Sequence, residues 1–240
     1  MNFYEVSKSF VSELHSCFWI AFLIGWIEMK FQYNLATLLG VSFVNIFAIA
    51  VFTWSSIHFS GSHFNPLITS VLLLSKRIKN YKAITHYIAQ FSGFLLGLIA
   101  LEIFMPVIDK KINNEDLCYG CAKVDKLFSF ISIAIAEFLG GFLVAFAYYA
   151  VIIDKRANSS LYAIFIGGAY GIMNLCYGKR MTVFLNPFRY LVGAIINNYY
   201  ENAVIYLFMP FFGAFYASWL FDRRILVDQP KVSEQNFNIN

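Results

Sequence analysis

Long apolar runs alternate with short polar segments along nearly all of the 240-residue chain. Six of these runs are long enough to cross the hydrocarbon core of a bilayer as a helix, which takes about 17 to 25 residues. They cover residues of about 10–27, 35–55, 84–105, 127–153, 160–177 and 203–221. The pattern predicts an all-α integral membrane protein with six transmembrane helices and little room for a separate soluble domain.

Two further apolar segments are too short to cross a bilayer, and each begins with Asn-Pro. They are Asn65-Pro66-Leu67 to about Leu74 and Asn186-Pro187-Phe188 to about Ile196. Asn is a preferred helix N-cap, and Pro fits the first helical position because its missing N–H is not needed there. Each segment is therefore predicted to be a half-helix whose N-terminus lies inside the membrane.

The order of these elements repeats in the two halves of the chain, about 8–106 and 127–222. Each half has a span with a glutamate (Glu13 or Glu137), a second span, an Asn-Pro half-helix and a last span. Three full spans per half invert the second copy, so the half-helices enter from opposite faces and meet at the midplane. We expect a single channel domain over residues 1–225 and a cytoplasmic tail over 226–240.

The meeting point of the half-helices has chemistry suited to a pore. Each helix N-terminus carries about half a positive charge and exposes unpaired N–H groups, so two of them repel cations, protons included. The amides of Asn65 and Asn186 can donate hydrogen bonds to a passing oxygen. Arg189, about one helical turn further on, adds a fixed charge and several donors. The arrangement predicts passage of small neutral polar molecules and exclusion of ions.

Composition and charge agree with a membrane channel. Only 13% of the residues are charged and 59% are hydrophobic, whereas soluble domains have about 25% charged residues. The net charge of +4 is small and no segment is basic and aromatic enough to indicate a nucleic-acid partner. Short loops rich in Lys and Arg remain on the cytoplasmic side of a membrane. With six spans both termini lie on the same side as the basic residues, so we expect both termini in the cytoplasm. These basic residues are Lys76, Arg77, Lys79, Lys82, Lys155, Arg156, Arg223 and Arg224.

Enzyme and metal chemistry find weak support in the sequence. Cys118 and Cys121 form a C-x-x-C without a second cysteine or histidine pair, which indicates a loop disulfide or two free thiols more than a metal or redox site. A membrane enzyme is the other alternative, and its titratable residues would be Glu13, His58, His63 and Glu137. These residues show neither the spacing of metal ligands nor the pattern of a nucleophile and its base. We expect no enzyme activity, no metal and no cofactor.

The two Asn-Pro stretches carry a family resemblance. Ser60-Gly61-Ser62-His63-Phe64-Asn65-Pro66 and Asn186-Pro187-x-Arg189 resemble the two signature motifs of the aquaporin and aquaglyceroporin, or major intrinsic protein, family. Ala136-Glu137-Phe138-Leu139-Gly140 and Ala89-Gln90-Phe91 are similar to parts of its fourth and third spans, so the resemblance covers nearly the whole chain. It implies the aquaporin fold and a homotetramer with one pore per subunit. It also implies that Glu13 and Glu137 brace the non-helical loops and that His63 helps to seat the first loop.

The third residue of each motif departs from the family. The family has Asn-Pro-Ala twice, whereas this chain has Leu67 and Phe188. Small alanines let the half-helices touch, so these larger side chains must either pack sideways or alter the pore. A closed, structural family member with little flux is therefore an alternative to a conducting channel.

Members of the family have a selectivity ring whose residues lie at fixed sequence distances from the two motifs. The resemblance places this ring in the present chain by the same distances from Asn65 and Asn186. These offsets predict a ring of Asn45, Asn174, Val183 and Arg189, which has two amides and no aromatic residue. The alternative for both asparagines is an interhelical hydrogen bond away from the pore, worth about 1 kcal/mol.

The preferred solute follows from the same resemblance. Glycerol channels of the family usually have Asp directly after the motif arginine, where this chain has Tyr190, yet the predicted ring is wider than a strict water filter. We expect a passive water channel that also passes small neutral solutes, in the plasma membrane or an intracellular membrane. A glycerol or urea channel of the aquaglyceroporin type is the alternative.

Overall fold

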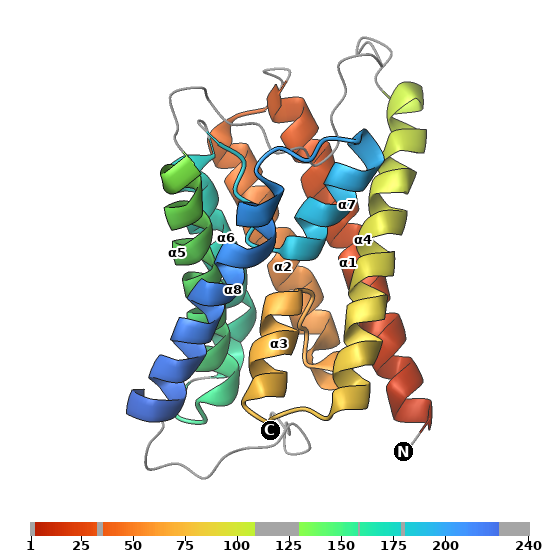
Figure 1. Ribbon diagram of the computed structural model, residues 1–240. Coiled ribbons are helices and arrows are strands. Elements are labelled where there is room, and N and C mark those ends of the chain that lie inside the picture. Colours follow the sequence, from red (N-terminus) through yellow and green to blue (C-terminus); the bar gives the residue numbers. More distant parts are fainter. Residues whose placement is uncertain (1–2, 33–35, 109–129, 158, 179–180, 226–240) are drawn as a thin grey trace.

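The computed structural model describes the chain apart from residues 1–2, 33–35, 109–129, 158, 179–180 and 226–240. The described part is built from helices (Figure 1). The α-helices are α1 (Phe3–Gln32), α2 (Leu38–Ser60), α3 (Pro66–Leu74), α4 (Asn80–Ile108), α5 (Phe130–Tyr148), α6 (Tyr162–Tyr177), α7 (Pro187–Asn197) and α8 (Ala203–Leu220). A 3-10 turn (Ser159–Leu161) precedes α6, and π-helical turns follow α5 (Tyr149–Ile153) and α8 (Phe221–Ile225).

Five helices of the described chain are long and apolar enough to cross a membrane. These spans are Tyr4–Gln32, Leu38–Ser60, Asn80–Phe104, Phe130–Ile153 and Ala203–Ile225. The remaining predicted span, 160–177, is the shorter apolar helix α6 of 16 residues. The first helix also begins earlier than the apolar pattern predicts, because the polar residues 3–8 continue it by more than one turn. The predicted all-α membrane fold is confirmed.

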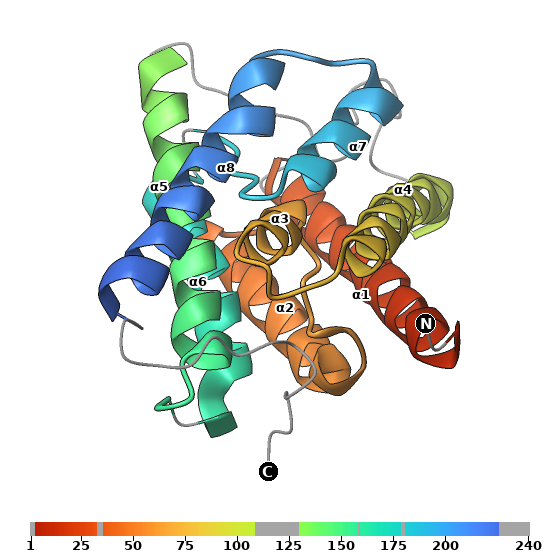
Figure 2. The ribbon, with the colours of Figure 1, turned by 60° about the horizontal axis from the view of Figure 1, so that its bottom comes forward.

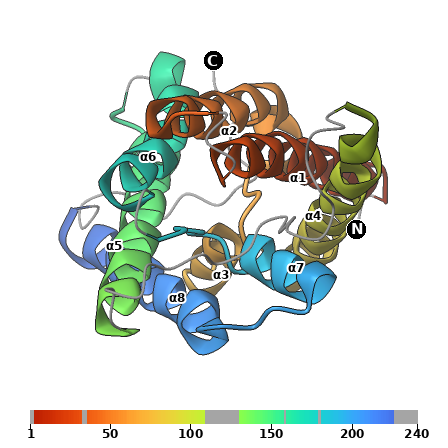
Figure 3. The same cartoon turned by 90° about the horizontal axis from the view of Figure 1, so that it is seen from above.

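The two halves of the chain build matching groups of helices. In the first half α1 packs against α4 and α2, and in the second half α5 packs against α8 and α6. Contacts between α2 and α6 join the halves, and Figure 3 shows α7 at the edge of the bundle between α4 and α8. The half-helices occupy opposite ends of the bundle: α3 lies in its lower half and α7 in its upper half (Figure 1). We call these ends the α3 end and the α7 end.

The helix that starts the chain and the helix that closes the fold share one end. Figures 1 and 2 show that α1 begins, and α8 finishes, at the α3 end of the bundle.

Many large apolar side chains stay exposed on the outer helices, among them Phe47, Trp54 and Phe212. Such a surface matches a lipid environment, in which exposed apolar side chains carry no cost.

Glycines allow the closest helix contacts. A Cβ atom at Gly93 would lie 2.4 Å from the Leu14 carbonyl oxygen of α1, and one at Gly97 only 2.3 Å from that of Phe18. Side chains at these positions would therefore push α4 away from α1. The two glycines, spaced four residues apart, therefore allow α1 and α4 to approach closely.

Candidate functional site

Each Asn-Pro motif caps its own half-helix. The Asn65 Oδ1 accepts a hydrogen bond from the backbone N–H of Leu67 at 3.0 Å. The Asn186 Oδ1 accepts from the N–H groups of Phe188 and Arg189, at 3.1 and 3.3 Å. Both asparagines have extended backbones and are followed by Pro at the start of the helix. The N-caps that the sequence predicts are therefore present, and they satisfy N–H groups that have no partner within the helix.

The two motifs also bind each other across the centre of the bundle. The Asn65 Nδ2 donates to the Leu185 carbonyl oxygen at 2.7 Å, and the Asn186 Nδ2 donates to the Phe64 carbonyl oxygen at 2.8 Å. Phe64 and Leu185 precede the asparagines and have left-handed backbones, with φ of 48° and 54°. A non-glycine residue in this conformation costs about 1–3 kcal/mol. The matching strain in both loops is offset by reciprocal hydrogen bonds between the motifs.

Buried glutamates hold the loops that lead into the motifs. Glu13 of α1 accepts hydrogen bonds from the N–H groups of His63 and Phe64, at 2.9 and 2.8 Å. Glu137 of α5 accepts from Phe184 and Leu185, at 2.8 and 3.1 Å. Each carboxylate therefore satisfies two backbone donors of a non-helical segment that has no helical or sheet partners of its own. The same arrangement, one buried glutamate that accepts from two loop N–H groups, occurs in both halves of the chain.

A polar network from three helices surrounds His63. Its Nδ1 lies 3.0 Å from the Thr69 hydroxyl of α3 and 2.9 Å from the Nδ1 of His86 on α4. The His86 Nε2 lies 2.7 Å from the hydroxyl of Ser9 on α1. These side chains are buried and connect the first loop to α1, α3 and α4. The sequence indicated a role for His63 but not its histidine partner on α4.

A narrow cavity lies beside the meeting point of the motifs. Its wall is apolar over most of its area, with Ile20, Ile49 and Phe94 among the apolar members. The space open to the centre of a water molecule is about 20 Å³. A cavity needs about 10–15 Å³ by this measure to hold one water molecule, so this cavity is just large enough for water. The polar lining residues are Ser62, His63, Tyr148, Tyr170, Asn186 and Arg189.

Tyr170 of α6 is bound to Asn65 and lines the cavity. The second Nδ2 donor of Asn65 goes to the Tyr170 hydroxyl oxygen at 2.7 Å, so both amide hydrogens have protein acceptors. Asn65 is absent from the cavity lining, whereas Tyr170 and Asn186 are part of it. In this structure the amide hydrogens of Asn65 therefore bind protein oxygens, and one of these oxygens belongs to Tyr170, which lines the cavity. An aromatic residue within an apolar span gave no signal of this role.

The large third residues of the motifs lie outside the cavity lining. Leu67 is fully buried in the core, and the Phe188 ring makes edge contacts with Tyr87 and Phe91 of α4, with centroids 6.2 and 5.8 Å apart. Neither residue belongs to the cavity lining. The ring contacts of Phe188 support sideways packing for that residue.

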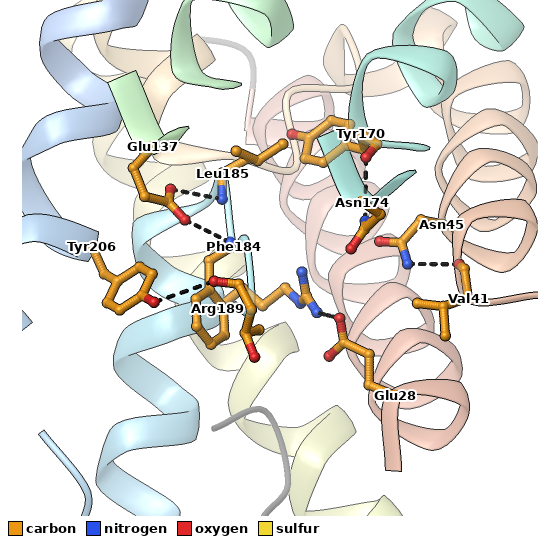
Figure 4. A network of polar contacts seen from close by, with 11 residues as sticks. Glu28, Val41, Asn45, Glu137, Tyr170, Asn174, Phe184, Leu185, Arg189 and Tyr206 are labelled. Carbon is orange, nitrogen blue, oxygen red and sulfur yellow. Dashed lines mark hydrogen bonds and ion pairs between the residues drawn. The ribbon is translucent and has the colours of Figure 1, made fainter. Parts of the chain in front are cut away.

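Arg189 forms a buried ion pair that the sequence did not reveal. Figure 4 shows its guanidinium paired with the carboxylate of Glu28, which lies near the end of α1 at the α7 end of the bundle. The guanidinium carbon also lies 5.2 Å from the centroid of the Phe184 ring. Glu28 directly follows the first apolar run, and its partner lies 161 positions later. Only the folded chain brings the two together.

The other predicted ring residues are buried on neighbouring elements. Asn45 of α2 donates from Nδ2 to the Val41 carbonyl at 2.9 Å, and Asn174 of α6 donates to the Tyr170 carbonyl at 3.2 Å. The Asn45 Oδ1 is buried without a hydrogen-bond partner. Both asparagines appear in Figure 4 beside the Arg189–Glu28 pair. Val183 is buried in the core, and Arg189 is the one member of the predicted ring that lines the cavity.

Metal-type clusters are absent from the residues that the structure describes. Nowhere in that part of the chain do three or more His, Cys, Asp or Glu side chains gather in a group that could hold a metal ion. Cys17 is buried and Cys176 is exposed, both as free thiols. The predicted loop pair, Cys118 and Cys121, lies outside the described residues, as do the tail and the long connection between the halves.

Comparison with known proteins agrees with this architecture. Nodulin-26 of Glycine max is 28% identical over 200 residues, which cover 82% of this chain and 70% of that protein. Probable aquaporin NIP4-2 of Arabidopsis thaliana is 28% identical over 182 residues, 76% of this chain and 61% of that protein, so this chain spans less than two thirds of that relative. The X-ray structure of the aquaglyceroporin from Plasmodium falciparum has a TM-score of 0.73 to this fold, covering 92% of this chain and 97% of that one. At 18% identity this likeness shows the fold alone.

The family model gives the assignment of the whole chain. The model of the major intrinsic protein family matches residues 2–221, which include both Asn-Pro motifs and all eight helices named above. Together with the fold and the paired half-helices, this match shows that the chain is an integral membrane protein of the major intrinsic protein family, the family of the aquaporin channels.

Proposed function

We propose that the protein is a passive channel for water and small neutral polar solutes that excludes ions and protons. The observation that carries this proposal is the narrow cavity beside the two half-helix N-termini, with Asn186 and Tyr170 in its wall. Both helix ends contribute positive partial charge at the centre of the bundle, which disfavours cations and a proton moving along a water chain. A neutral oxygen can instead accept hydrogen bonds there.

Each motif residue has a role in this proposal. Asn65 and Asn186 fix the two half-helices to each other, Pro66 and Pro187 start them, and Leu67 and Phe188 anchor them in the surrounding helices. Glu13, Glu137 and His63 hold the loops in place. The sideways packing of the two large residues argues against a plugged, purely structural family member.

The ring of Asn45, Asn174, Val183 and Arg189 is proposed as the selectivity filter. The unpartnered Asn45 Oδ1 offers an acceptor, and the guanidinium offers donors, so a solute with O–H or N–H groups could be bound from both sides. The ring has no aromatic side chain, which supports passage of solutes larger than water, such as glycerol or urea. An aquaglyceroporin-type channel therefore remains the second candidate.

The orientation and assembly are also proposed. Basic residues gather near the α3 end, including Arg77, Lys82 and Arg156, and the positive-inside rule then puts this end in the cytoplasm. Both termini would lie on that side. We expect a homotetramer in the plasma membrane or an intracellular membrane, with one pore in each subunit.

Stopped-flow light scattering on proteoliposomes tests the choice of solute. Vesicles are first shrunk with sucrose, which reports water permeability, and then with glycerol or urea, whose re-entry reswells them. Fast shrinkage followed by faster re-entry than in protein-free vesicles supports a channel for water and small neutral solutes. Fast shrinkage with re-entry no faster than in protein-free vesicles would restrict the proposal to water alone.

A further inference from the structure

We infer that Glu28 is a positioning and specificity-determining residue of the filter, which balances the charge of Arg189. The inference rests on the proposed channel function. With the Glu28–Arg189 pair intact, the filter is electrically neutral as a unit and therefore favours neither anions nor cations. Glu28 would be a fifth filter residue, beside Asn45, Asn174, Val183 and Arg189.

The geometry holds the two charges in one place. Glu28 comes from the last turns of α1, and Arg189 comes from the first turn of α7. The side chains are 12% and 7% exposed, so water competes little for either charge. The Phe184 ring lies against the guanidinium from the loop before α7, at 5.2 Å from the guanidinium carbon. The carboxylate and the ring together hold the guanidinium in the channel wall (Figure 4).

Among the residues that the structure describes, Glu28 is the acid that forms an ion pair with Arg189. Glu137 lies on the other side of the Phe184 loop, where both of its oxygens accept backbone N–H groups. Asn45 and Asn174 present uncharged amides. Glu28 is therefore the paired carboxylate of Arg189, and removing it would leave the buried guanidinium without this partner.

The pairing predicts opposite leaks when either partner is neutralised. In Glu28→Gln the lone guanidinium attracts anions into the filter, and chloride flux rises. In Arg189→Gln the lone carboxylate attracts cations, and potassium flux rises. In the double variant neither charge remains, so both fluxes fall back toward those of the unaltered protein.

The experiment measures chloride and potassium fluxes of proteoliposomes with ion-sensitive dyes, with water flux recorded on the same vesicles. We expect chloride flux in Glu28→Gln, and potassium flux in Arg189→Gln, to rise by roughly fivefold or more over the unaltered protein, as for an uncompensated charge in a low-dielectric site. The matched control is Asp222→Asn. It breaks a buried ion pair of similar chemistry, Arg77–Asp222 at 2.6 Å, at the α3 end and outside the filter. This control should change neither ion flux.

The outcomes separate this inference from the proposed function. If the unaltered protein passes no water, the channel proposal fails. If it passes water and both single variants leave ion fluxes unchanged, or the double variant leaks as much as the singles, the role of Glu28 is overturned. Should Glu28→Gln fail to assemble, the double variant decides: it buries no lone charge, so recovery of folded protein supports the pairing and continued misfolding contradicts it.

Discussion

At the scale of single residues, the direction of a side chain matters more than its size. Leu67 and Phe188 are larger than the alanines that the family has in these positions, and the sequence alone allowed them to fill the pore. In the structure Leu67 is buried in the core and Phe188 packs on the rings of Tyr87 and Phe91. Their bulk therefore contributes to packing between the half-helices and the surrounding bundle.

The variant Leu67→Ala with Phe188→Ala should consequently lose stability without gaining flux. Truncating a buried Leu costs about 2–5 kcal/mol, and the half-buried ring adds to this loss. We expect a lower thermal unfolding midpoint in detergent and no increase in water permeability per folded channel. A several-fold rise in flux would instead identify the two residues as a plug.

Tyr170 is the residue whose size we expect to limit the solute. Its ring lines the cavity and its hydroxyl accepts a hydrogen bond from Asn65. Tyr170→Ala should raise glycerol permeability by roughly tenfold, as for a barrier lower by about 1.4 kcal/mol. Tyr170→Phe, which keeps the ring and removes only the hydroxyl, should not produce this increase. Equal glycerol re-entry in both variants would show that the ring does not limit passage.

At the scale of elements, the two non-helical loops depend on one carboxylate each. In Glu137→Ala the N–H groups of Phe184 and Leu185 lose their acceptor. An unpaired buried donor costs about 1–3 kcal/mol, so we expect a loss of about 2–6 kcal/mol in unfolding free energy. Glu13→Ala should behave similarly, and Glu137→Gln, which retains one acceptor oxygen, should fall between. Thermal unfolding of the three variants checks this order; an unchanged midpoint in Glu137→Ala would contradict it.

Two adjacent glycines of α6 give a matched test of the contact between the halves. A Cβ at Gly167 would lie 2.2 Å from the Ile46 carbonyl oxygen of α2, whereas one at Gly168 has nothing within 4 Å. Gly167→Ala should therefore destabilise the protein by about 1–3 kcal/mol through overpacking. Gly168→Ala should be neutral or stabilising by about 0.5–1 kcal/mol, because Ala favours the helix. Equal unfolding midpoints for the two variants would contradict the close approach of α2 and α6.

At the scale of the whole molecule, the features that could be predicted are those that depend on residues close together in the sequence. Apolar run length predicted five membrane-length helices and the shorter helix α6, and the Asn-Pro pairs predicted half-helices that begin at Pro66 and Pro187. Pairings between distant segments could not be predicted in this way. Glu28 meets Arg189 across 161 positions, and Tyr170 meets Asn65 across 105, because helix packing decides both contacts. Tyr170 resembles the other residues of its apolar helix, and the position of Glu28 after the first apolar run does not show which cation it meets.

The most direct test of the channel is water and proton permeability measured on the same proteoliposomes. An osmotic gradient reports water flux by light scattering, and an enclosed pH-sensitive dye reports proton flux under a pH gradient. A pore at the meeting point of the half-helices predicts water flux well above that of protein-free vesicles and proton flux equal to theirs. Folded protein that leaves water flux at the protein-free level, or that passes protons together with water, would contradict it.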